Sequence, residues 1–149
     1  MTTLGYTSGV YDLFHIGHLN LLKNAKGLCD KLLKNAKGLC DKLIVGVTID
    51  ELVQYKNKKS VIPFSERIEI VRSIKYVDAA IPQENIDKYQ MWEKLHFDVL
   101  FVGDDWFNTP NWNIMEEKFK KVNVRVIYFP YTKGTSSTLI NETLKNLRQ

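Results

Sequence analysis

Short runs of β-branched and apolar residues alternate with helix-forming segments along the whole chain, and this alternation restricts the fold more than any other feature. Extended runs are predicted at residues 4–8, 43–48, 77–81, 98–103 and 124–129. Helical spacing of apolar residues is found between and after them, at 21–29, 66–74, 86–96, 112–121 and 138–147. The pattern therefore predicts an α/β fold: a Rossmann-like doubly wound parallel sheet, in a single domain over residues 1–149.

Two residues mark boundaries within this pattern. Ser65 precedes the helical segment 66–74, and its hydroxyl is expected to cap that helix. Pro82 follows the run 77–81 and is expected to end that strand. In open parallel sheets, ligands bind outside the carboxyl ends of the strands, so the residues that directly follow each strand are the candidates for function.

Residues 21–31 and 32–42 have the same sequence, LLKNAKGLCDK, which indicates a local duplication. Each copy carries three Lys and one Asp, so one copy supplies half of the net charge of +4. A net charge of this size does not indicate nucleic-acid binding. No nucleic-acid partner is expected, because the aromatic residues do not alternate with a basic stripe. Cys29 and Cys40 are one position copied, which predicts buried thiols in a reducing compartment rather than a disulfide.

The period of the repeat suits a helix, because 11 residues make three turns with about 20° to spare. A helix through both copies would nevertheless run about 16 Å past the sheet and leave only two residues for the return. We therefore expect the helix to hold the first copy alone and the chain to leave it after about Gly27, with Gly38 as a second place to break.

The chain shows no signal for a membrane. No apolar run approaches the length of about 18 residues that a spanning helix needs, so no membrane insertion is expected. The first four residues, MTTL, lack the basic and then apolar layout of a signal peptide. A cytoplasmic location is expected.

Two histidines lie where the first helix is predicted to begin. Residues 8–18 read SGVYDLFHIGH, with Gly17 between His15 and His18. Helix N-terminal amides and imidazole N–H groups both donate hydrogen bonds to phosphate oxygens, so this segment is a candidate triphosphate site. The alternatives are a capped helix with two exposed histidines, or a metal pair, for which no third ligand is evident nearby.

The motifs GVYD at 9–12 and HIGH at 15–18 resemble the signature of the cytidylyltransferase branch of the HxGH nucleotidyltransferases, and most closely its bacterial glycerol-3-phosphate cytidylyltransferases. Further blocks match that family in order: KNKK at 56–59, YVD at 76–78, VGDDW at 102–106 and GTSST at 134–138. With one copy of the repeat removed, the likeness covers nearly the whole chain.

The resemblance implies transfer of CMP from CTP to a phosphorylated alcohol, glycerol 3-phosphate or a similar one, with release of pyrophosphate. It implies that His15 and His18 act at the α- and β-phosphates, that Lys56 faces the acceptor phosphate and that Lys58 faces the nucleotide. It also implies Mg²⁺ bound with the triphosphate, and a homodimer. The alternative for residues 55–60 is a solvated polar loop.

The other residues implied to bind the nucleotide follow three of the predicted strands. They are Gly9, Val10, Tyr11 and Gly17 after the first strand, Asp104 and Asp105 after the fourth, and Lys133, Gly134, Ser136, Ser137 and Thr138 before the last helix. The two aspartates could instead shape a turn, and the hydroxyls could cap the helix as well as bind phosphate. Trp92, Trp112 and His96 have no motif around them and are interpreted as packing residues.

The chain departs from the family's pattern at two positions. Tyr131 stands where the family has an arginine, a bidentate partner for phosphate, and Lys133 could supply the charge instead. Val10 stands where close relatives have threonine, a change of little consequence if only the backbone is used. Two alternative functions remain: an adenylyltransferase of the same fold that makes an ADP-linked product, and a catalytically silent nucleotide-binding module.

Overall fold

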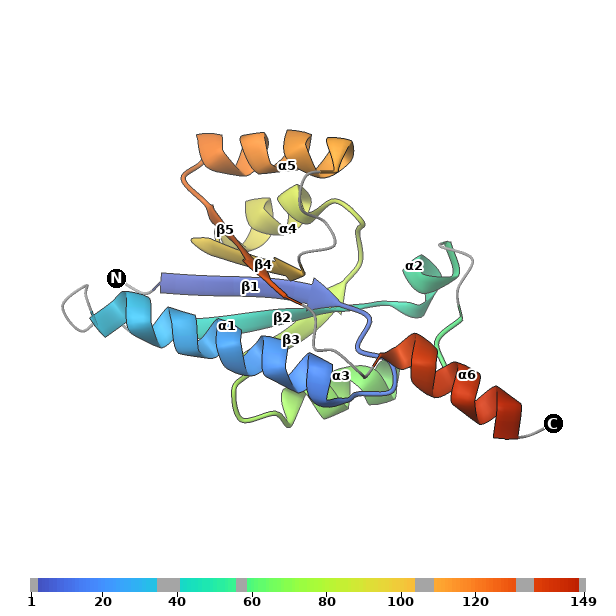
Figure 1. Cartoon of the computed structure of the whole chain (residues 1–149). Coiled ribbons are helices and arrows are strands. Elements are labelled where there is room, and N and C mark those ends of the chain that lie inside the picture. The colour runs from blue at the N-terminus through green and yellow to red at the C-terminus, as the bar shows by residue number, and fades with distance from the viewer. Residues whose placement is uncertain (1–2, 35–40, 56–58, 104–108, 131–135, 148–149) are drawn as a thin grey trace.

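Five parallel strands in the order β3-β2-β1-β4-β5 form the centre of the protein, seen here in a computed structural model (Figure 1). The structure describes residues 3–34, 41–55, 59–103, 109–130 and 136–147, with the backbone alone for 28–34, 41 and 55. The strands are β1 (Thr3–Gly9), β2 (Asp41–Thr48), β3 (Ala79–Gln83), β4 (Val99–Gly103) and β5 (Arg125–Phe129). All four strand pairs are parallel, which confirms the predicted doubly wound α/β fold.

Helices cover both faces of this sheet (Figure 1). They are α1 (Ile16–Lys34), α2 (Asp50–Tyr55), α3 (Phe64–Arg72), α4 (Lys88–Leu95), α5 (Pro110–Lys121) and α6 (Ser137–Leu147). The helices α1 and α3 lie on one face, and α4 and α5 lie on the other. The order of the strands reverses between β1 and β4, so the crevice of this fold lies at the carboxyl ends of those two strands.

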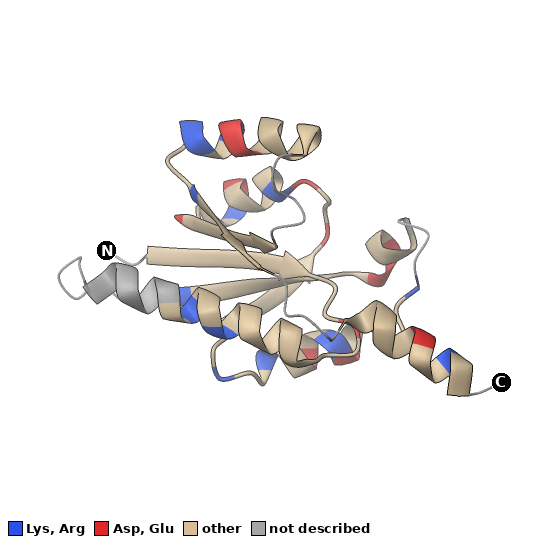
Figure 2. Cartoon of the chain, in the orientation of Figure 1, with Lys and Arg blue, Asp and Glu red and all other residues tan. Residues whose placement is uncertain are grey.

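Alternation along each strand divides the core between the two faces. In β4, Val99 and Phe101 pack with the α1 and α3 side, whereas Leu100 and Val102 pack with the α4 and α5 side. The strands β1 and β4 contain no charged residue, and the charges lie mostly on the helices and loops (Figure 2). Trp112 is buried on the α4 and α5 side of the sheet, which confirms its predicted packing role. Its Nε1 donates to the Tyr128 hydroxyl at 2.7 Å.

The predicted boundary at Pro82 is wrong, because β3 includes this proline and continues to Gln83. Pro82 aligns with Val47 of β2. The strand β3 lies at the edge of the sheet, where a residue without an N–H can point its nitrogen away from the ladder. A proline therefore marks an edge strand here rather than the end of a strand.

The predicted cap at Ser65 is also wrong, since α3 begins one residue earlier, at Phe64, with Pro63 in the cap position. The free N–H of Phe64 is bound at 3.0 Å by the carboxylate of Asp50, from the start of α2. A side chain distant in sequence thus does what a local hydroxyl was expected to do. The pattern also missed α2 itself, a helix of six residues.

We expected the first helix to end after about Gly27. This prediction is wrong, because α1 continues to Lys34. A glycine inside a helix costs only about 1 kcal/mol, and helix-forming Lys and Leu residues surround this one. The helix therefore ends three residues into the second copy, and residues 35–40 connect it to β2. The expectation failed because it required the helix either to stop with the first copy or to include the whole second copy. The side chains of Cys29 and Cys40 lie outside the described residues.

We predict that deleting residues 32–42 leaves turnover within a few-fold of the unaltered chain and raises stability. The histidine end of α1 and its Lys34 end are about 24 Å apart at 1.5 Å per residue. The deletion also keeps an Asp and a Lys directly before Leu43, where β2 now begins with Asp41 and Lys42, because residues 30–31 repeat 41–42. Steady-state rates and thermal unfolding of both chains check this, and a folded deletion variant without activity would contradict it.

Candidate active site

The loop from β1 to α1 turns through two residues in the left-handed conformation. Tyr11 has φ 56° and Leu13 has φ 49°. This conformation costs a residue with a side chain about 1–2 kcal/mol, so the surrounding structure must hold it in place. A Cβ at Gly9 would lie 3.2 Å from a carbon of the Tyr11 ring, so the absence of a side chain at Gly9 leaves room for that ring.

Arg67 of α3 binds the backbone of this loop. Its side chain is completely buried, and its NH1 donates to the carbonyl oxygens of Val10 at 2.6 Å and Thr48 at 2.8 Å. Its Nε donates to the Ile62 carbonyl at 2.9 Å, and its NH2 lies 2.6 Å from an Asp50 carboxylate oxygen. One guanidinium therefore joins the loop after β1, the end of β2, and the start of both α2 and α3. Val10 contributes its backbone carbonyl to this contact.

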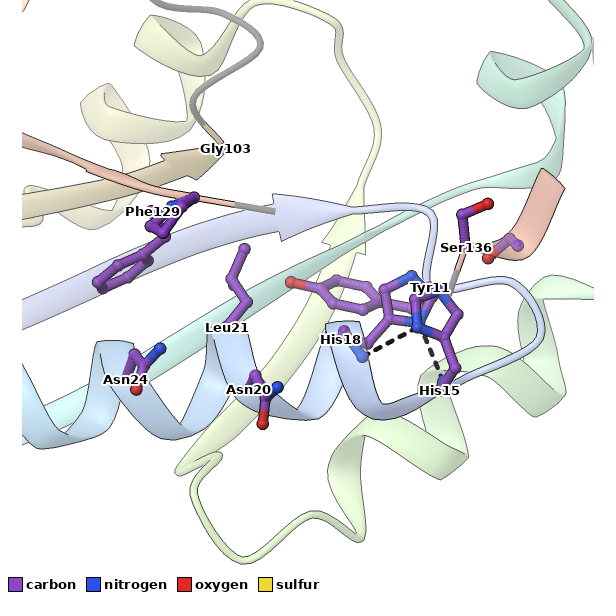
Figure 3. Close-up of a pocket in the computed structure, with 12 residues that line it drawn as sticks. Tyr11, His15, His18, Asn20, Leu21, Asn24, Gly103, Phe129 and Ser136 are labelled. Carbon is purple, nitrogen blue, oxygen red and sulfur yellow. Dashed lines mark hydrogen bonds between the residues drawn. The ribbon is translucent and has the colours of Figure 1, made fainter. Parts of the chain in front are cut away.

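The two histidines stack on each other at the start of α1, with ring centroids 3.9 Å apart (Figure 3). The Nδ1 of His15 accepts a hydrogen bond from the Gly17 N–H at 3.0 Å, and the Nδ1 of His18 accepts one from the His15 N–H at 3.3 Å. A nitrogen that accepts a hydrogen bond carries no proton, so in each neutral ring the proton is assigned to Nε2. Both rings therefore keep an Nε2–H donor.

The protein environment favours the neutral form of both histidines. Burial lowers the pKa of His15. Burial and the neighbouring His15 lower the pKa of His18 to about 4, although the Asp12 carboxylate opposes this shift. Burial raises the pKa of the Tyr11 phenol, whose ring lies 5.2 Å from the His18 ring. At neutral pH the site therefore presents neutral N–H and O–H groups rather than fixed imidazolium charge.

A cavity of about 380 Å³ lies beside these rings, at the point where the strand order reverses (Figure 3). Its volume is in the range of small-molecule sites. Residues from the loop after β1, from α1, from the ends of β4 and β5, and from the start of α6 line it: Tyr11, His15, Gly17, His18, Asn20, Leu21, Asn24, Gly103, Phe129, Pro130, Ser136 and Ser137.

The start of α6 brings two hydroxyl groups to the cavity. The Ser136 hydroxyl accepts from the Leu139 N–H at 3.0 Å, which is a helix cap. The Ser137 hydroxyl donates to the backbone carbonyl of Asp12. The interpretation of this segment as a capped helix is therefore confirmed for Ser136. Because Ser136 and Ser137 also line the cavity, the start of α6 remains a candidate for phosphate binding.

The structure brings six of the predicted site residues to one cavity: Tyr11, His15, Gly17, His18, Ser136 and Ser137. Gly9 and Val10 lie directly before this group in the chain, and Thr138 directly after it, without lining the cavity. Six further predicted residues fall outside the described part of the chain, as does Tyr131: Lys56, Lys58, Asp104, Asp105, Lys133 and Gly134. Their roles stay predictions.

Sequence reasoning missed the apolar side of the cavity. Phe129 and Pro130 line it at the end of β5, and Leu21 lines it from α1. A signal was present for each of these residues. Phe129 ends a predicted strand and Pro130 directly follows it, and Leu21 lies three residues after His18, on the same helix face.

The described residues do not themselves form a metal site, since no group of three or more His, Cys, Asp and Glu side chains among them could hold an ion. The nearby carboxylate of Asp12 already accepts hydrogen bonds from Val61 N and Ile62 N, one at each oxygen. A divalent cation held mainly by phosphate oxygens fits this donor set, whereas one held mainly by the described side chains does not. None of the described helices has the length and hydropathy of a membrane span.

Comparison with known proteins gives one family for nearly the whole chain. A family model described as cytidylyltransferase-like matches residues 6–143. The glycerol-3-phosphate cytidylyltransferase of Staphylococcus aureus is 36% identical over 139 residues, which cover 93% of this chain and 92% of that protein.

Two further similarities are more distant. The FAD synthase of Thermococcus kodakarensis is 32% identical over 127 residues, covering 83% of this chain and 76% of that protein. Among solved structures, a lipopolysaccharide core biosynthesis protein from Thermoplasma volcanium superposes with a TM-score of 0.67 at 22% identity. That superposition covers 89% of this chain and 98% of the other. At this identity the structural likeness supports the fold alone.

Proposed function

We propose, because the chain belongs to the cytidylyltransferase-like family, that it transfers CMP from CTP to a small phosphorylated alcohol and releases pyrophosphate. Family membership makes it a nucleotidyltransferase, and the finer assignment rests on its similarity to glycerol-3-phosphate cytidylyltransferases. The observation that supports it best is the pair of stacked histidines, each with Nε2 assigned as a donor, beside a cavity at the switch point of the sheet.

In the proposed reaction, an oxygen of the acceptor phosphate attacks the α-phosphorus of CTP in line, and the bond to the bridging oxygen of pyrophosphate breaks. Negative charge grows on the transferring group and on the leaving pyrophosphate. The Nε2–H groups of His15 and His18 donate to oxygens of the α- and β-phosphates, and the N–H groups at the start of α6 serve the same triphosphate. No covalent enzyme intermediate is needed.

We propose that Mg²⁺ binds with the triphosphate, as the resemblance to the cytidylyltransferase-like family implies. The metal supplies charge neutralisation to the phosphates when bound. We also propose a homodimer, which sedimentation at micromolar concentration would test.

A thermal-shift screen of nucleoside triphosphates with Mg²⁺ tests the proposal. A ligand that binds only the native state adds about 2.7 kcal/mol of stability at a hundred times its Kd. We expect CTP to stabilise the protein selectively, and we expect pyrophosphate release from CTP to depend on glycerol 3-phosphate or a similar alcohol phosphate. Stabilisation by a triphosphate without release of pyrophosphate would favour the catalytically silent nucleotide-binding module, and stabilisation by no triphosphate would contradict the proposal.

One alternative reaction has support of its own. The similarity to an FAD synthase favours an adenylyltransferase, since FAD is itself an ADP-linked product. Selective stabilisation by ATP in the same screen would favour that reaction over cytidylyl transfer.

We predict that Lys56→Ala raises the KM for the alcohol phosphate about tenfold or more, and more than it raises the KM for CTP. The reason is the loss of a charge-assisted hydrogen bond to the acceptor phosphate. Lys58→Ala should show the opposite preference, and Lys59→Ala, which changes a neighbouring exposed lysine, is the matched control. A larger effect of Lys56→Ala on the KM for CTP, together with a larger effect of Lys58→Ala on the KM for the alcohol phosphate, would show that the two roles are exchanged.

A further inference from the structure

Asp12 connects two segments that come from different parts of the chain. It lies in the loop after β1, between Tyr11 and Leu13, which both have positive φ. Its carboxylate accepts from two consecutive backbone amides, with Oδ2 2.8 Å from Val61 N and Oδ1 2.9 Å from Ile62 N. A carboxylate that accepts two N–H groups in this way fixes both the position and the orientation of the segment that donates them.

The backbone of the same residue holds the start of α6. The carbonyl oxygen of Asp12 accepts the hydrogen bond from the Ser137 hydroxyl, at the end of that helix that lines the cavity. Asp12 therefore binds the nucleotide side of the site through its main chain, and through its side chain it binds the segment that follows residues 56–59 in the sequence.

These contacts also bear on the conformation of the loop. A residue between two left-handed neighbours holds its place only while the surrounding bonds outweigh the backbone cost. If binding at either side orders this loop, the other ligand meets a loop that is already ordered, and so binds at a lower entropic cost.

We propose that Asp12 is a positioning residue that couples the two substrates, so that each binds more tightly when the other is bound. This inference rests on the proposed function, because it takes the segment before Val61 to face the acceptor phosphate. The coupling is reciprocal by thermodynamic necessity, and a factor of about five or more is expected for coupling between sites. Asp12 acts through the segments it holds, without contact to the reacting atoms.

Equilibrium binding of a non-reactive CTP analogue tests the coupling. The Kd of α,β-methylene-CTP is measured by calorimetry with Mg²⁺, with and without saturating glycerol 3-phosphate. The ratio of the two Kd values is the coupling factor, and it is compared between the unaltered chain, Asp12→Asn and Asp98→Asn. Asp98 is the matched control, because its carboxylate also accepts from a backbone amide, Leu4 N at 2.8 Å, at the opposite end of the sheet.

We expect a coupling factor of about five or more for the unaltered chain and for Asp98→Asn. For Asp12→Asn we expect a coupling factor near one, because the asparagine amide can accept only one of the two N–H groups. Ser137→Ala, which removes only the hydroxyl contact, should also lower the factor and serves if Asp12→Asn does not fold.

A factor of one in the unaltered chain, or an unchanged factor in both variants, would overturn the coupling and leave the proposed function in place. An unaltered chain that binds no CTP analogue would overturn the proposed function and the coupling together.

Discussion

Replacing His18 with alanine is expected to lower kcat by two to three orders of magnitude, the range measured when one preorganised donor to a developing negative charge is removed. His18 provides such a donor because its Nδ1 is occupied by the His15 N–H and its proton is therefore on Nε2. Since the lost interaction is strongest in the transition state, the KM for CTP should change less than kcat. Steady-state kinetics measures both quantities.

The chain offers substitutions that separate this role from a structural one. Glutamine places its amide nitrogen near the position of Nε2 and asparagine near that of Nδ1, so His18→Gln should keep more activity than His18→Asn. His96→Asn is the control, because His96 is an exposed residue with φ 51° at the end of α4, a conformation that asparagine tolerates. A folded His18→Ala variant with nearly unchanged rates would exclude the proposed role.

The pH dependence of the free energy of unfolding should also change in His18→Ala. Burial and the neighbouring His15 lower the pKa of His18 from 6.5 to about 4, so the unfolded state binds more protons between these two values. The contribution of neutral His18 to stability is therefore complete above pH 6.5 and is lost as the pH falls towards 4. Unfolding in urea at several pH values should show a weaker acid dependence for His18→Ala than for the unaltered chain.

The fold could be predicted from the sequence because each of its elements has a local pattern. The run 43–48 lies within β2, and 98–103 includes β4. The errors arose where contacts distant in sequence override that local pattern. Pro82 is tolerated because β3 is an edge strand, and α3 begins at Phe64 because a carboxylate from α2 binds its first amide. Neither the neighbouring strand nor that carboxylate can be read from the local sequence.

The candidate site was predictable to the extent that its residues share one segment. Tyr11, His15 and His18 lie together at the start of α1, and the cavity is found beside them. The residues that hold this segment were harder to recognise, because Arg67 is 57 positions from Val10 and only the folded chain brings them within 2.6 Å. The pattern at residue 67 indicated an ordinary helix position, where an arginine is usually exposed.

Replacing Arg67 with methionine is expected to lower the free energy of unfolding by about 3–5 kcal/mol, because a completely buried guanidinium loses several hydrogen bonds that are each worth about 1.5–3 kcal/mol. Methionine keeps much of the side-chain length but leaves four acceptors without their donor: Asp50 and the carbonyls of Val10, Thr48 and Ile62. Lysine should rescue little, since one ammonium group cannot reproduce the planar arrangement of donors that reaches all four. Denaturation in urea measures each variant.

Arg72→Met is the matched control, because Arg72 lies five residues further along α3 with its side chain 50% exposed. Its nitrogen lies 3.8 Å from the Glu69 carboxylate, and such surface pairs contribute at most about 1 kcal/mol. A cost for Arg67→Met no larger than that for Arg72→Met would contradict the anchoring role.

The pKa of Asp50 provides a second, independent measure of the same contact. Burial alone would raise it, but hydrogen bonds from the Phe64 N–H, Arg67 and Ser60 lower it overall. The stability that this carboxylate contributes is present above its unfolded pKa of 3.8 and is lost as the pH falls through the lowered native value. In Arg67→Met the native pKa should rise, because a cationic partner and a hydrogen bond are gone, so the Asp50 contribution should be lost at a higher pH. Arg72→Met, which does not touch Asp50, should leave that pH dependence unchanged.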